Sequence, residues 1–520
     1  MSTVPALLAE TAERFGERPA VVDGDNRLTF AELRDRARTF GAALVASGVG
    51  PGDRVAIWAP NCAEWIVAVL GLFEAGAVLV PVNTRFKGVE AADILGRSGA
   101  TALVTVTDFL GTDYVSMLAD SGVELPALRT TVVARGPAPD GTVSWGDFLA
   151  LATDDARAEV ARRAVAVGTD DVSDILFTSG TTGVPKGVVQ THGRTLTVAT
   201  DWVAMTGITA GDRYLMVNPY FHMFGLKAGI LASVAAGVTM YPEPVFDVDR
   251  VLARVAEERI TVLPGPPTLY QSILDHPDRD RHDLSSLRVA VTGAADIPVA
   301  LIRRVVGELP FPTIVSGYGL TEGGTASATS PVDTVETIAT TIGRPRPGFE
   351  VRIVDDQGAD VPVGEAGQIL LRGGSIMTHY LDDPEATAQA LSEDGWLRTG
   401  DLGVMDRAGY LRFVGRTKDM FIVGGFNAYP AEIENALLRH DDIRQAAVIG
   451  IPDGRMGEVG MAFVVLRPGA TVTGEDIIEW SRDQMANYKV PRAVEIVDEL
   501  PLNATGKVEK QALRDRVVPA

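Results

Sequence analysis

Hydrophobic and polar residues follow two kinds of pattern over the first part of the chain, one typical of helices and one typical of strands. Amphipathic stretches with apolar residues three or four positions apart predict helices at 29–47, 64–75, 251–258 and 300–308. Short runs rich in β-branched residues predict strands at 54–58, 102–106, 260–263 and 313–316, with a turn at 48–53. This alternation predicts a large N-terminal domain of layered α/β subdomains with mostly parallel sheets.

The pattern changes after about residue 340 to short β-rich segments separated by glycines. These predict strands at 350–355, 368–372 and 410–414, with a loop at 363–367, in a small β-rich subdomain. Beyond Gly415 a new α+β unit is predicted, with helices at 430–438 and 474–485 and strands at 445–451 and 462–466. We therefore expect an N-terminal domain over 1–414, a hinge at 415–419 and a small mobile C-terminal domain over 420–520.

The composition fits a folded protein with more than one domain. The chain has 520 residues, 46% of them apolar, and a single core rarely grows beyond about 300 residues. Its 47 basic and 68 acidic residues give a net charge of −21, which would repel a nucleic-acid backbone. We expect no nucleic-acid partner, and a site for a nucleotide must concentrate the few cations locally.

Cysteine use and hydropathy favour a cytoplasmic protein without a membrane span. Cys62 is the single cysteine, so neither an intrachain disulfide nor a cysteine-bound metal cluster can form. The N-terminal sequence lacks the basic start and apolar stretch of a signal peptide. The most apolar segments are 65–83, which Glu74 interrupts, and 228–242, which is too short to cross a bilayer.

The strongest chemical signal is the segment 178–187, with the sequence Thr-Ser-Gly-Thr-Thr-Gly-Val-Pro-Lys-Gly between two apolar runs. Its glycines let the backbone approach an anion, its hydroxyls add donors and Lys186 adds a charge, so the segment can cradle a phosphate. It is not a Walker A loop, because Pro185 precedes and Gly187 follows the lysine. Composition alone also allows a solvated hairpin turn.

With this motif the chain resembles the adenylate-forming superfamily, which contains acyl-CoA synthetases, firefly luciferase and the adenylation domains of peptide synthetases. Further motifs follow in the family's order, and the resemblance covers essentially the whole chain. It implies ATP, Mg²⁺ and coenzyme A as cofactors and a small carboxylic acid as substrate. It assigns the ATP phosphates to Thr178, Ser179, Gly180, Thr181, Thr182, Gly183 and Lys186.

Three later motifs resemble the family's nucleotide and metal contacts. In the segment 317–322, Tyr318 offers a stacking face for adenine, Thr321 a hydroxyl for phosphate, and Glu322, with Thr178, an oxygen ligand for Mg²⁺. The segment 293–295 resembles the floor of the adenine pocket, although a plain tight loop is equally compatible. Asp401 resembles the ribose-binding carboxylate. The implied ATP contacts are Gly293, Ala294, Ala295, Tyr318, Gly319, Thr321, Asp401 and Arg416.

Two lysines near the C-terminus have family roles that composition alone would not assign. Lys418 stands at the hinge position, and Lys507 follows a Pro-containing turn as the family's adenylation lysine does. A carboxylate with a pKa near ~4 is already an ionised nucleophile at pH 7, so adenylation needs no general base. It needs charge neutralisation, which Lys507, Lys186 and Mg²⁺ would supply. After domain rotation, coenzyme A would meet Gly424, Gly425 and Phe426, whereas Asn427 replaces the Gln or Arg of many relatives.

The acyl pocket is implied by the aromatic segment 218–225. His222 either gates the pocket or assists the thiol of coenzyme A, whose pKa is about 8.5. A buried Lys227 is costly unless it faces a polar substrate group or an acidic partner. The stretches 224–229 and 264–276 resemble ligases that activate the propanoate side chain of the indanedione left by steroid-ring degradation, which implies a cyclic or medium-chain acid. The implied pocket residues are His222, Phe224, Lys227, Ala228 and Gly265.

Other functions compete with acyl-CoA ligation. A stand-alone adenylating enzyme that loads a separate carrier protein would share the adenylation residues, and no carrier motif Gly-x-Asp-Ser-Leu is present. The resemblance disfavours an amino-acid substrate, because amino-acid-activating relatives usually hold the α-amine with an aspartate after this aromatic residue, whereas His222 follows Phe221. Hydrolase and zinc-enzyme motifs, Gly-x-Ser-x-Gly and His-Glu-x-x-His, are absent. The sequence is compatible with a homodimer and leaves a non-enzymatic nucleotide binder as a further alternative.

Overall fold

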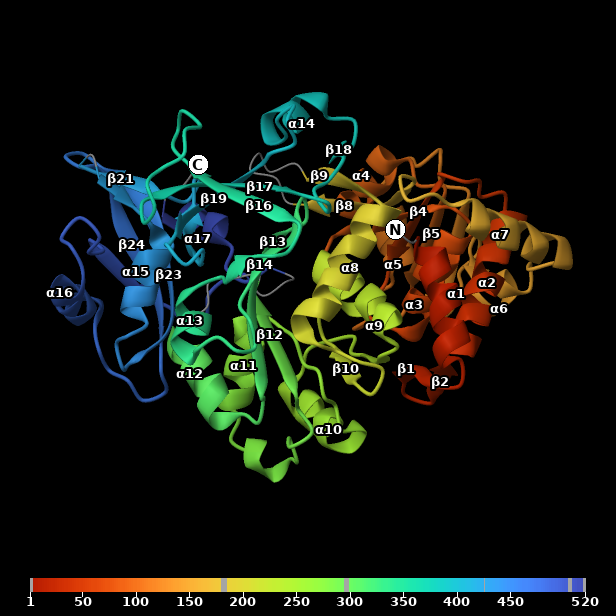
Figure 1. The fold of residues 1–520 in the computed structure, drawn as a ribbon, viewed down its shortest axis with the longest axis horizontal. Helices are drawn as coiled ribbons and strands as arrows, with labels where there is room; N and C mark the ends of the chain where they lie inside the picture. Colours follow the sequence, from red (N-terminus) through yellow and green to blue (C-terminus); the bar gives the residue numbers. More distant parts are fainter. Residues whose placement is uncertain (1–2, 179–184, 294–298, 425, 504–506, 518–520) are drawn as a thin grey trace.

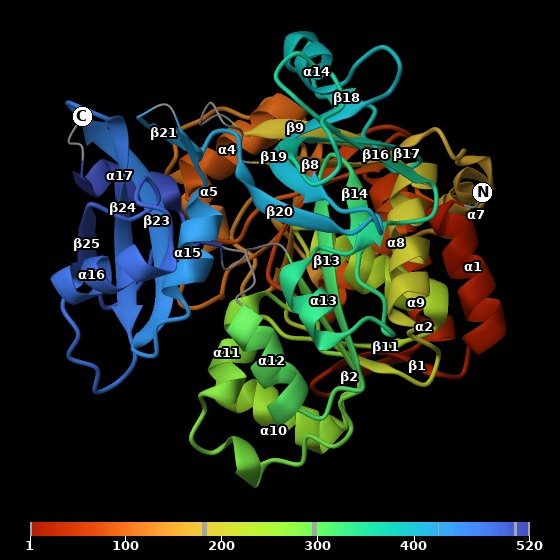
Figure 2. The same ribbon diagram turned by 60° about the vertical axis from the view of Figure 1, so that its left-hand side comes forward.

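The computed structural model describes residues 3–178, 185–293, 299–424, 426–503 and 507–517 (Figure 1). Three sheet layers form the larger part of the molecule, and a C-terminal unit lies on one side of it (Figures 1 and 2). The predicted mixed α/β architecture with a separate C-terminal unit is confirmed. None of the helices in the described ranges is both long and apolar enough to cross a membrane.

The first layer is an eight-stranded sheet with the order β18-β9-β8-β4-β3-β5-β6-β7. Its strands from β8 to β7 are parallel, whereas β9 and β18 add in antiparallel fashion. The central strands are apolar and fully buried, as expected when helices cover both faces. The strand bounds are β3 Arg54–Trp58, β4 Val78–Pro81, β5 Ala102–Val106, β6 Thr130–Arg135, β7 Val143–Ser144, β8 Val172–Thr178, β9 Lys186–Thr191 and β18 His379–Tyr380.

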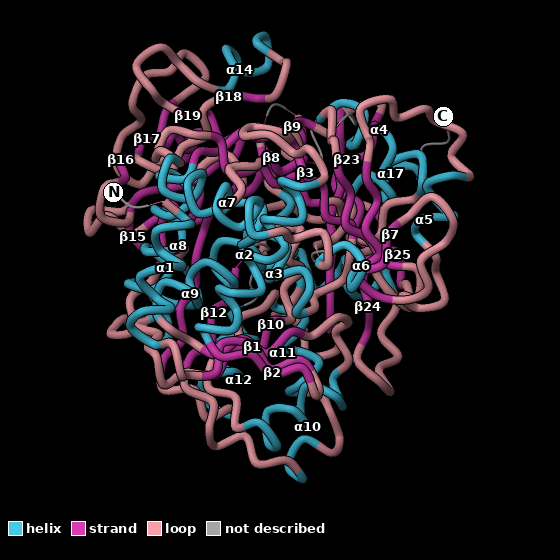
Figure 3. The backbone as a smooth tube through the Cα atoms, turned by 90° about the vertical axis from the view of Figure 1, so that its right-hand side faces the viewer, coloured by secondary structure: helices cyan, strands magenta, loops and turns pink. Residues whose placement is uncertain are grey.

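Helices at the N-terminus pack together beside this sheet (Figure 3). Phe40 of α2 and Trp58 of β3 are among the large side chains that this region buries completely. Burying such a side chain contributes about 1.5–3 kcal/mol each, so this cluster is a rigid base for the loops at the strand ends. The helices are α1 Val4–Phe15, α2 Phe30–Ala46, α3 Ala63–Glu74, α4 Gly88–Ser98, α5 Tyr114–Ala119, α6 Trp145–Leu149 and α7 Asp154–Ala166.

The second layer consists of two four-stranded groups, β10-β11-β1-β2 and β12-β13-β14-β15, joined through Val262. Val262 bridges Tyr214 and Val289, so the predicted strand at 260–263 is reduced to a single bridge, because Pro264 cannot continue a ladder. The bounds are β1 Pro19–Asp23, β2 Asn26–Thr29, β10 Arg213–Met216, β11 Thr239–Pro242, β12 Val289–Gly293, β13 Thr313–Leu320, β14 Gly324–Ala328 and β15 Arg344–Pro345.

Helices of the second layer carry the segments that lead to the acyl region. A π-helical segment, η1 Phe224–Leu231, continues into α9 Ala232–Ala236 and packs on α8 His192–Thr206. Single π-helical turns are frequent at functional sites. The remaining helices are α10 Val248–Glu258, α11 Pro267–Leu274, the short η2 Arg279–Arg281, α12 Val299–Glu308 and α13 Val335–Thr340.

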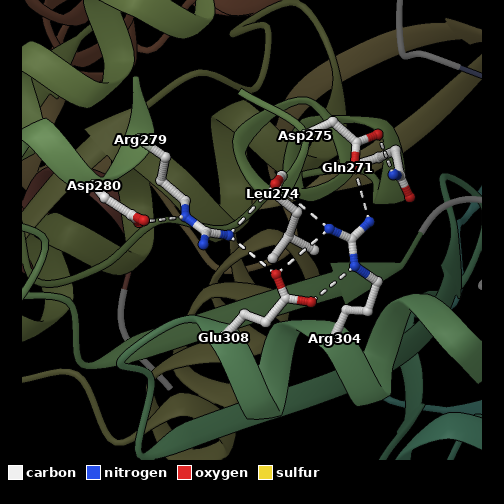
Figure 4. A network of polar contacts seen from close by, with 7 residues as sticks. All are labelled: Gln271, Leu274, Asp275, Arg279, Asp280, Arg304 and Glu308. Atoms are coloured by element: carbon white, nitrogen blue, oxygen red, sulfur yellow. Dashed lines mark hydrogen bonds and ion pairs between the residues drawn. The ribbon is translucent and has the colours of Figure 1, made fainter. Parts of the chain in front are cut away.

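Ion pairs fasten α11 to α12 at the surface (Figure 4). Arg304 lies 2.8 Å from Asp275 and 2.9 Å from Glu308, and Arg279 reaches the same Glu308 at 3.2 Å. Each exposed pair contributes at most about 1 kcal/mol, but a network holds geometry better than isolated pairs do. It fixes the helix that follows Gly265 in the chain.

The third layer is a small antiparallel sheet, β16-β17-β19-β20, and it matches the predicted β-rich subdomain. Its strands are β16 Phe349–Val354, β17 Ala366–Gly373, β19 Leu397–Met405 and β20 Leu411–Arg416, and α14 Pro384–Ala390 lies beside it. The loop predicted at 363–367 is shorter than expected, because β17 begins at Ala366 and pairs with Val404 there.

The C-terminal unit follows β20 after residues 417–420 and has its own hydrophobic core. Its strands run in the order β22-β21-β24-β23, with β25 parallel to β24. The bounds are β21 Phe421–Val423, β22 Phe426–Ala428, α15 Pro430–Leu437, β23 Ile443–Asp453, β24 Gly457–Leu466, α16 Gly474–Gln484, β25 Ala493–Ile496 and α17 Lys510–Val517.

Candidate active site

The predicted phosphate loop connects β8 to β9, which pair as an antiparallel hairpin. Thr178 pairs with Lys186 at the two ends of the loop. The predicted contacts Ser179, Gly180, Thr181, Thr182 and Gly183 lie outside the described residues. Lys186 directs its ammonium nitrogen to 5.1 Å from the centre of the Tyr380 ring, so the loop's cation rests over an aromatic face.

Tyr380 connects this lysine to the predicted metal ligand. Its hydroxyl donates a hydrogen bond of 2.9 Å to Oε1 of Glu322. Burial raises the pKa of Glu322, because desolvation disfavours the charged carboxylate, while the hydrogen bond from Tyr380 partly offsets this effect. Thr321 is buried beside it. A carboxylate held in this way gains strongly from a bound cation.

Close backbone contacts explain the glycines of the predicted adenine segment. A Cβ atom on Gly293 would lie 2.5 Å from the carbonyl oxygen of Gly317, and one on Gly319 would lie 2.4 Å from that of Gly324. Only glycine fits at such distances. Ala294 and Ala295 lie outside the described residues, so their predicted contact with adenine stays a prediction.

Tyr318, Asp401 and Arg416 come together from three strands. The Tyr318 hydroxyl donates to Asp401 Oδ2 at 2.6 Å, and Arg416 Nε lies 3.2 Å from Asp401 Oδ1. Burial raises the pKa of Asp401, whereas the nearby Arg416 and the Tyr318 hydrogen bond act in the opposite direction. The group joins an aromatic ring, a carboxylate and a half-exposed cation, which are the functions that a nucleoside phosphate requires.

Lys507 reaches the same place from the C-terminal unit. Its positive charge acts on the pKa values of both Asp401 and His222, so it lies within electrostatic range of the two groups. Its backbone is fixed by two contacts with Asn503, from Lys507 N to Asn503 Oδ1 at 3.0 Å and from Asn503 N to Lys507 O at 2.8 Å. Arg85 donates to the carbonyl oxygen of Leu502 at 3.4 Å, so this loop also touches the N-terminal domain.

His222 is half-buried and neutral. Burial, with the positive charge of Lys507 as a second cause, lowers the pKa of its imidazole to about 3. Nδ1 accepts a hydrogen bond from the backbone N–H of Phe224 at 3.2 Å. An imidazole with so low a pKa is a weak base, so in the arrangement with Lys507 nearby the shift favours the gating interpretation over proton transfer.

Lys227 is fully buried in η1 and has an acidic partner that the sequence analysis did not name. Its Nζ lies 2.9 Å from Oδ1 of Asp174 in β8. Ser173 and Thr195 each donate a hydroxyl to Oδ2 of Asp174 at 2.6 Å. The pKa of Lys227 is lowered by burial, and Asp174 acts against this shift. The pair therefore neutralises the cation within the protein.

The other predicted acyl residues, Phe224, Ala228 and Gly265, are closely packed. Phe224 meets Trp202 of α8 edge to face, with ring centres 5.1 Å apart. Gly265 donates its N–H to Val291 O at 3.0 Å, and a Cβ there would lie 2.6 Å from a methyl carbon of Leu269. Ala228 is buried in the same core as Trp202.

Of the predicted hinge and coenzyme A residues, Lys418, Gly424 and Phe426 lie at the surface. Lys418 is exposed in the short link between β20 and β21. Gly424 has a positive φ of 57°, and Phe426 is 61% exposed and stacks on Tyr488 at 5.1 Å. Gly425 lies outside the described residues. In this arrangement the Lys507 loop contacts the N-terminal domain while the ring of Phe426 faces solvent.

The donor set around Glu322 fits a magnesium ion that ATP brings with it. The described ranges contain no group of three His, Cys, Asp or Glu side chains, so a site built from protein ligands alone is not found there. Mg²⁺ is commonly held by one or two carboxylates together with substrate phosphates. One buried, partly satisfied carboxylate next to the phosphate loop meets that requirement.

Several residues of the site were missed by sequence reasoning. Asp174 interrupts an apolar strand, and such a buried acid indicates a hidden partner, although the strand pattern does not identify Lys227 as that partner. Tyr380 gave no such signal, because its contacts with Lys186 and Glu322 depend on strand β18 joining β9.

Comparison with known proteins agrees with this geometry. Residues 8–381 match the family profile described as AMP-binding enzyme, and residues 432–507 match AMP-binding enzyme C-terminal domain. The chain is 51% identical over 517 residues, 99% of its length and 98% of the relative's, to the 3-[(3aS,4S,7aS)-7a-methyl-1,5-dioxo-octahydro-1H-inden-4-yl]propanoyl:CoA ligase of Rhodococcus jostii. It is 50% identical, over 99% of each chain, to the protein of the same name from Mycobacterium tuberculosis.

A solved structure is similar over nearly the full chain. The anthranilate CoA ligase AuaEII in complex with anthranoyl-AMP superimposes with a TM-score of 0.90 at 29% identity, covering 99% of this chain and 97% of the other. The similarity therefore includes both the larger part of the molecule and the C-terminal unit.

Proposed function

The chain belongs to the AMP-binding enzyme family, and we propose that within it the protein is an ATP-dependent ligase that joins a carboxylic acid to coenzyme A. The observation that carries this proposal is the buried Asp401 of the N-terminal domain, which has Lys507 of the C-terminal unit within electrostatic range. Tyr318 and Arg416 complete the group. A cation of one domain thus acts electrostatically on the nucleotide-type groups of the other.

In the first half-reaction, a carboxylate oxygen of the acid attacks the α-phosphorus of ATP. The bond between the α-phosphorus and the bridging oxygen breaks, so that acyl-AMP and pyrophosphate form. Lys186 and Lys507 neutralise the anions that approach one another, and Asp401 accepts hydrogen bonds from the ribose hydroxyls. Glu322 and Thr178 would hold Mg²⁺, which adds positive charge at the phosphates.

In the second half-reaction, the thiol of coenzyme A attacks the acyl carbonyl, and a thioester forms as AMP leaves. Lys507 must leave the site before the thiol can reach the acyl carbonyl. Rotation of the C-terminal domain at Lys418 would permit this. The same rotation would bring Gly424, Gly425 and Phe426 to the pantetheine arm. His222 stays neutral and serves as a wall or gate of the pocket. Because ATP and coenzyme A are intracellular metabolites, we expect the enzyme to work in the cytoplasm.

For the acid, we propose the 7a-methyl-dioxo-octahydroindenyl propanoate that names the two relatives at 51% and 50% identity. The near-complete coverage of those relatives supports this choice. The pocket chemistry supports it as well, because Phe224 and Ala228 are apolar and Asp174 neutralises Lys227. A neutral bicyclic diketone suits such a wall better than a charged acyl group does.

Pyrophosphate release across a panel of acids tests this function. The panel would contain the bicyclic propanoate, a medium-chain fatty acid, an aromatic acid and an amino acid, each with and without coenzyme A. We expect release with the bicyclic acid, and mass spectrometry should find its thioester and AMP. Acyl-AMP that coenzyme A cannot discharge would favour loading of a separate carrier protein, and no release with any acid would refute the ligase.

A further inference from the structure

Arg97, in the last turn of α4, contacts a residue at each end of the predicted phosphate loop, Phe177 in β8 and Pro185 just before β9. Its Nη1 donates a hydrogen bond of 2.7 Å to the carbonyl oxygen of Pro185, and its guanidinium carbon lies 5.3 Å from the centre of the Phe177 ring. Asp93, one helical turn earlier, forms an ion pair with it at 3.3 Å. Phe177 directly precedes Thr178, and Pro185 directly precedes Lys186, so Arg97 contacts the loop at both of its ends.

The hairpin itself is tightly packed where Arg97 meets it. Phe177 pairs with Gly187 across the two strands. A Cβ on Gly187 would lie 3.2 Å from the tip of the Phe177 ring and 3.1 Å from the Cβ of Leu381. The ring thus touches Gly187 and carries the guanidinium over its face, which leaves it little freedom to shift.

The contact with Pro185 acts on Lys186 through the peptide bond that joins them. Proline has a fixed φ near −65° and no N–H, so its conformational freedom lies mainly in the orientation of its carbonyl group. A charged donor that binds this carbonyl oxygen fixes the plane of the peptide bond between Pro185 and Lys186. Arginine can stack on a ring and donate from its edge at the same time, which lysine cannot do.

We propose that Arg97 is a positioning residue for the phosphate loop: it holds both ends of the loop and thereby directs Lys186 toward the phosphates of ATP. This inference rests on the proposed function, since it assumes that the loop binds ATP. In this role Arg97 acts through Pro185 and Phe177 and does not itself bind a substrate group. Its removal should therefore lower kcat/KM for ATP and leave the KM for the carboxylic acid unchanged.

The test compares Arg97→Ala and Arg97→Lys with the wild type in pyrophosphate release, with ATP and the acid varied separately. We expect kcat/KM for ATP to fall about tenfold in Arg97→Ala, the effect of one lost charge-assisted hydrogen bond. The KM for the acid should stay within about twofold. Arg97→Lys should recover part of the loss, because lysine still reaches the carbonyl. Phe177→Leu, which removes the stacking face alone, should give a smaller defect of the same kind.

Arg129→Ala is the matched control. Arg129 is also a partly exposed arginine of the N-terminal domain with one ion pair, at 3.3 Å to Asp53, and among the described residues its guanidinium otherwise donates to the carbonyl oxygen of Gly48. The Arg129→Ala variant should have the same kcat/KM for ATP and the same KM for the acid as the wild type. Equal kcat/KM for ATP in Arg97→Ala and wild type would overturn the inference, and so would a parallel rise in the KM values of both substrates.

Direct ATP binding, measured by titration calorimetry without any acid, separates this inference from the proposed function. If the wild type releases no pyrophosphate with any acid, the ligase proposal fails, but a loss of ATP affinity in Arg97→Ala would still support the role of Arg97. Unchanged ATP affinity together with unchanged kinetics would refute it. Thermal unfolding of all variants should agree within a few degrees, because Arg97 is 35% exposed at a helix end.

Discussion

The predicted nucleotide side and the predicted acyl side of the site bury charge in opposite ways. On the nucleotide side, burial raises the pKa values of Asp401 and Glu322, and their partners are two tyrosine hydroxyls and the half-exposed Arg416. On the acyl side, Asp174 holds a fully buried cation at 2.9 Å, and two hydroxyls occupy its other oxygen. The first arrangement leaves capacity for a ligand, whereas the second satisfies itself.

This difference separates function from stability. Groups that await a ligand are costly in the free protein and favourable once ribose, phosphate or a cation arrives. Groups that satisfy one another contribute to the fold and make the surrounding wall effectively neutral. Removing a carboxylate should therefore lower mainly the stability of the protein on the acyl side and mainly the use of ATP on the nucleotide side.

The largest expected effect is on folding, from Asp174→Asn. The change leaves the buried Lys227 without a counter-charge, which typically costs about 3–5 kcal/mol of the free energy of unfolding. Asp401→Asn should cost much less, because Arg416 can turn to solvent, but it should impair ATP use. Urea unfolding of both variants checks the contrast. Equal destabilisation by the two substitutions would contradict it.

The next effect concerns ATP alone. Tyr318→Phe removes the 2.6 Å hydrogen bond to Asp401 and keeps the ring. We expect kcat/KM for ATP to fall about tenfold, as for other hydrogen bonds to charged groups, with an unchanged KM for the acid. Steady-state kinetics with each substrate varied in turn would show whether only the ATP parameters change. A tenfold change in the KM for the acid would argue against separate nucleotide and acyl sides.

A smaller effect should appear as extra stability in Glu322→Gln. Because burial raises the folded-state pKa of Glu322 above its unfolded value, its contribution is favourable below the unfolded pKa and is lost as the pH rises through the folded pKa. The variant should thus be more stable than the wild type at neutral pH, by about 1 kcal/mol. Unfolding curves between pH 4 and 8 should show the gap widening with pH, and a constant gap would exclude this cause.

The smallest effect is expected at His222. With a pKa of about 3, its imidazole stays neutral across the range in which the enzyme would work. The pH profile of adenylation in His222→Asn should therefore keep the wild-type shape. Since the folded pKa lies below the unfolded value, the stability linked to His222 is present above about pH 6.5 and is lost as the pH falls toward 3. A step near pH 6.5 that disappears in the variant would restore the proton-transfer interpretation.

The sequence predicted the layered α/β fold because hydrophobic periodicity is a local property. Strand 54–58 and the helices at 29–47 and 430–438 agree with the structure to within one residue at each end. The segment 260–263 shows the limit, since whether an apolar run pairs along its length depends on its neighbours. The motif order also indicated Tyr318, Asp401 and Arg416, which three strands bring together.

Contacts between distant segments could not be predicted in this way. The partner of Lys227 lies 53 positions earlier in the chain, in a strand whose apolar pattern gives no direction to Asp174. Tyr380 reaches Glu322 and Lys186 only because β18 joins the edge of the first sheet. The pKa of His222 likewise depends on burial and on Lys507, which three-dimensional packing alone provides.

The central claim is that Lys507 serves adenylation from the arrangement described here, and the two half-reactions of Lys507→Ala test it most directly. Pyrophosphate release from acid and ATP should fall at least about 100-fold, because a cation at the reacting phosphate is lost. Thioester formation from supplied acyl-AMP and coenzyme A should keep its rate, and Lys489→Ala, which removes a C-terminal lysine paired with Glu432, should adenylate normally. Adenylation at the wild-type rate in Lys507→Ala, or an equal loss in both half-reactions, would contradict the account.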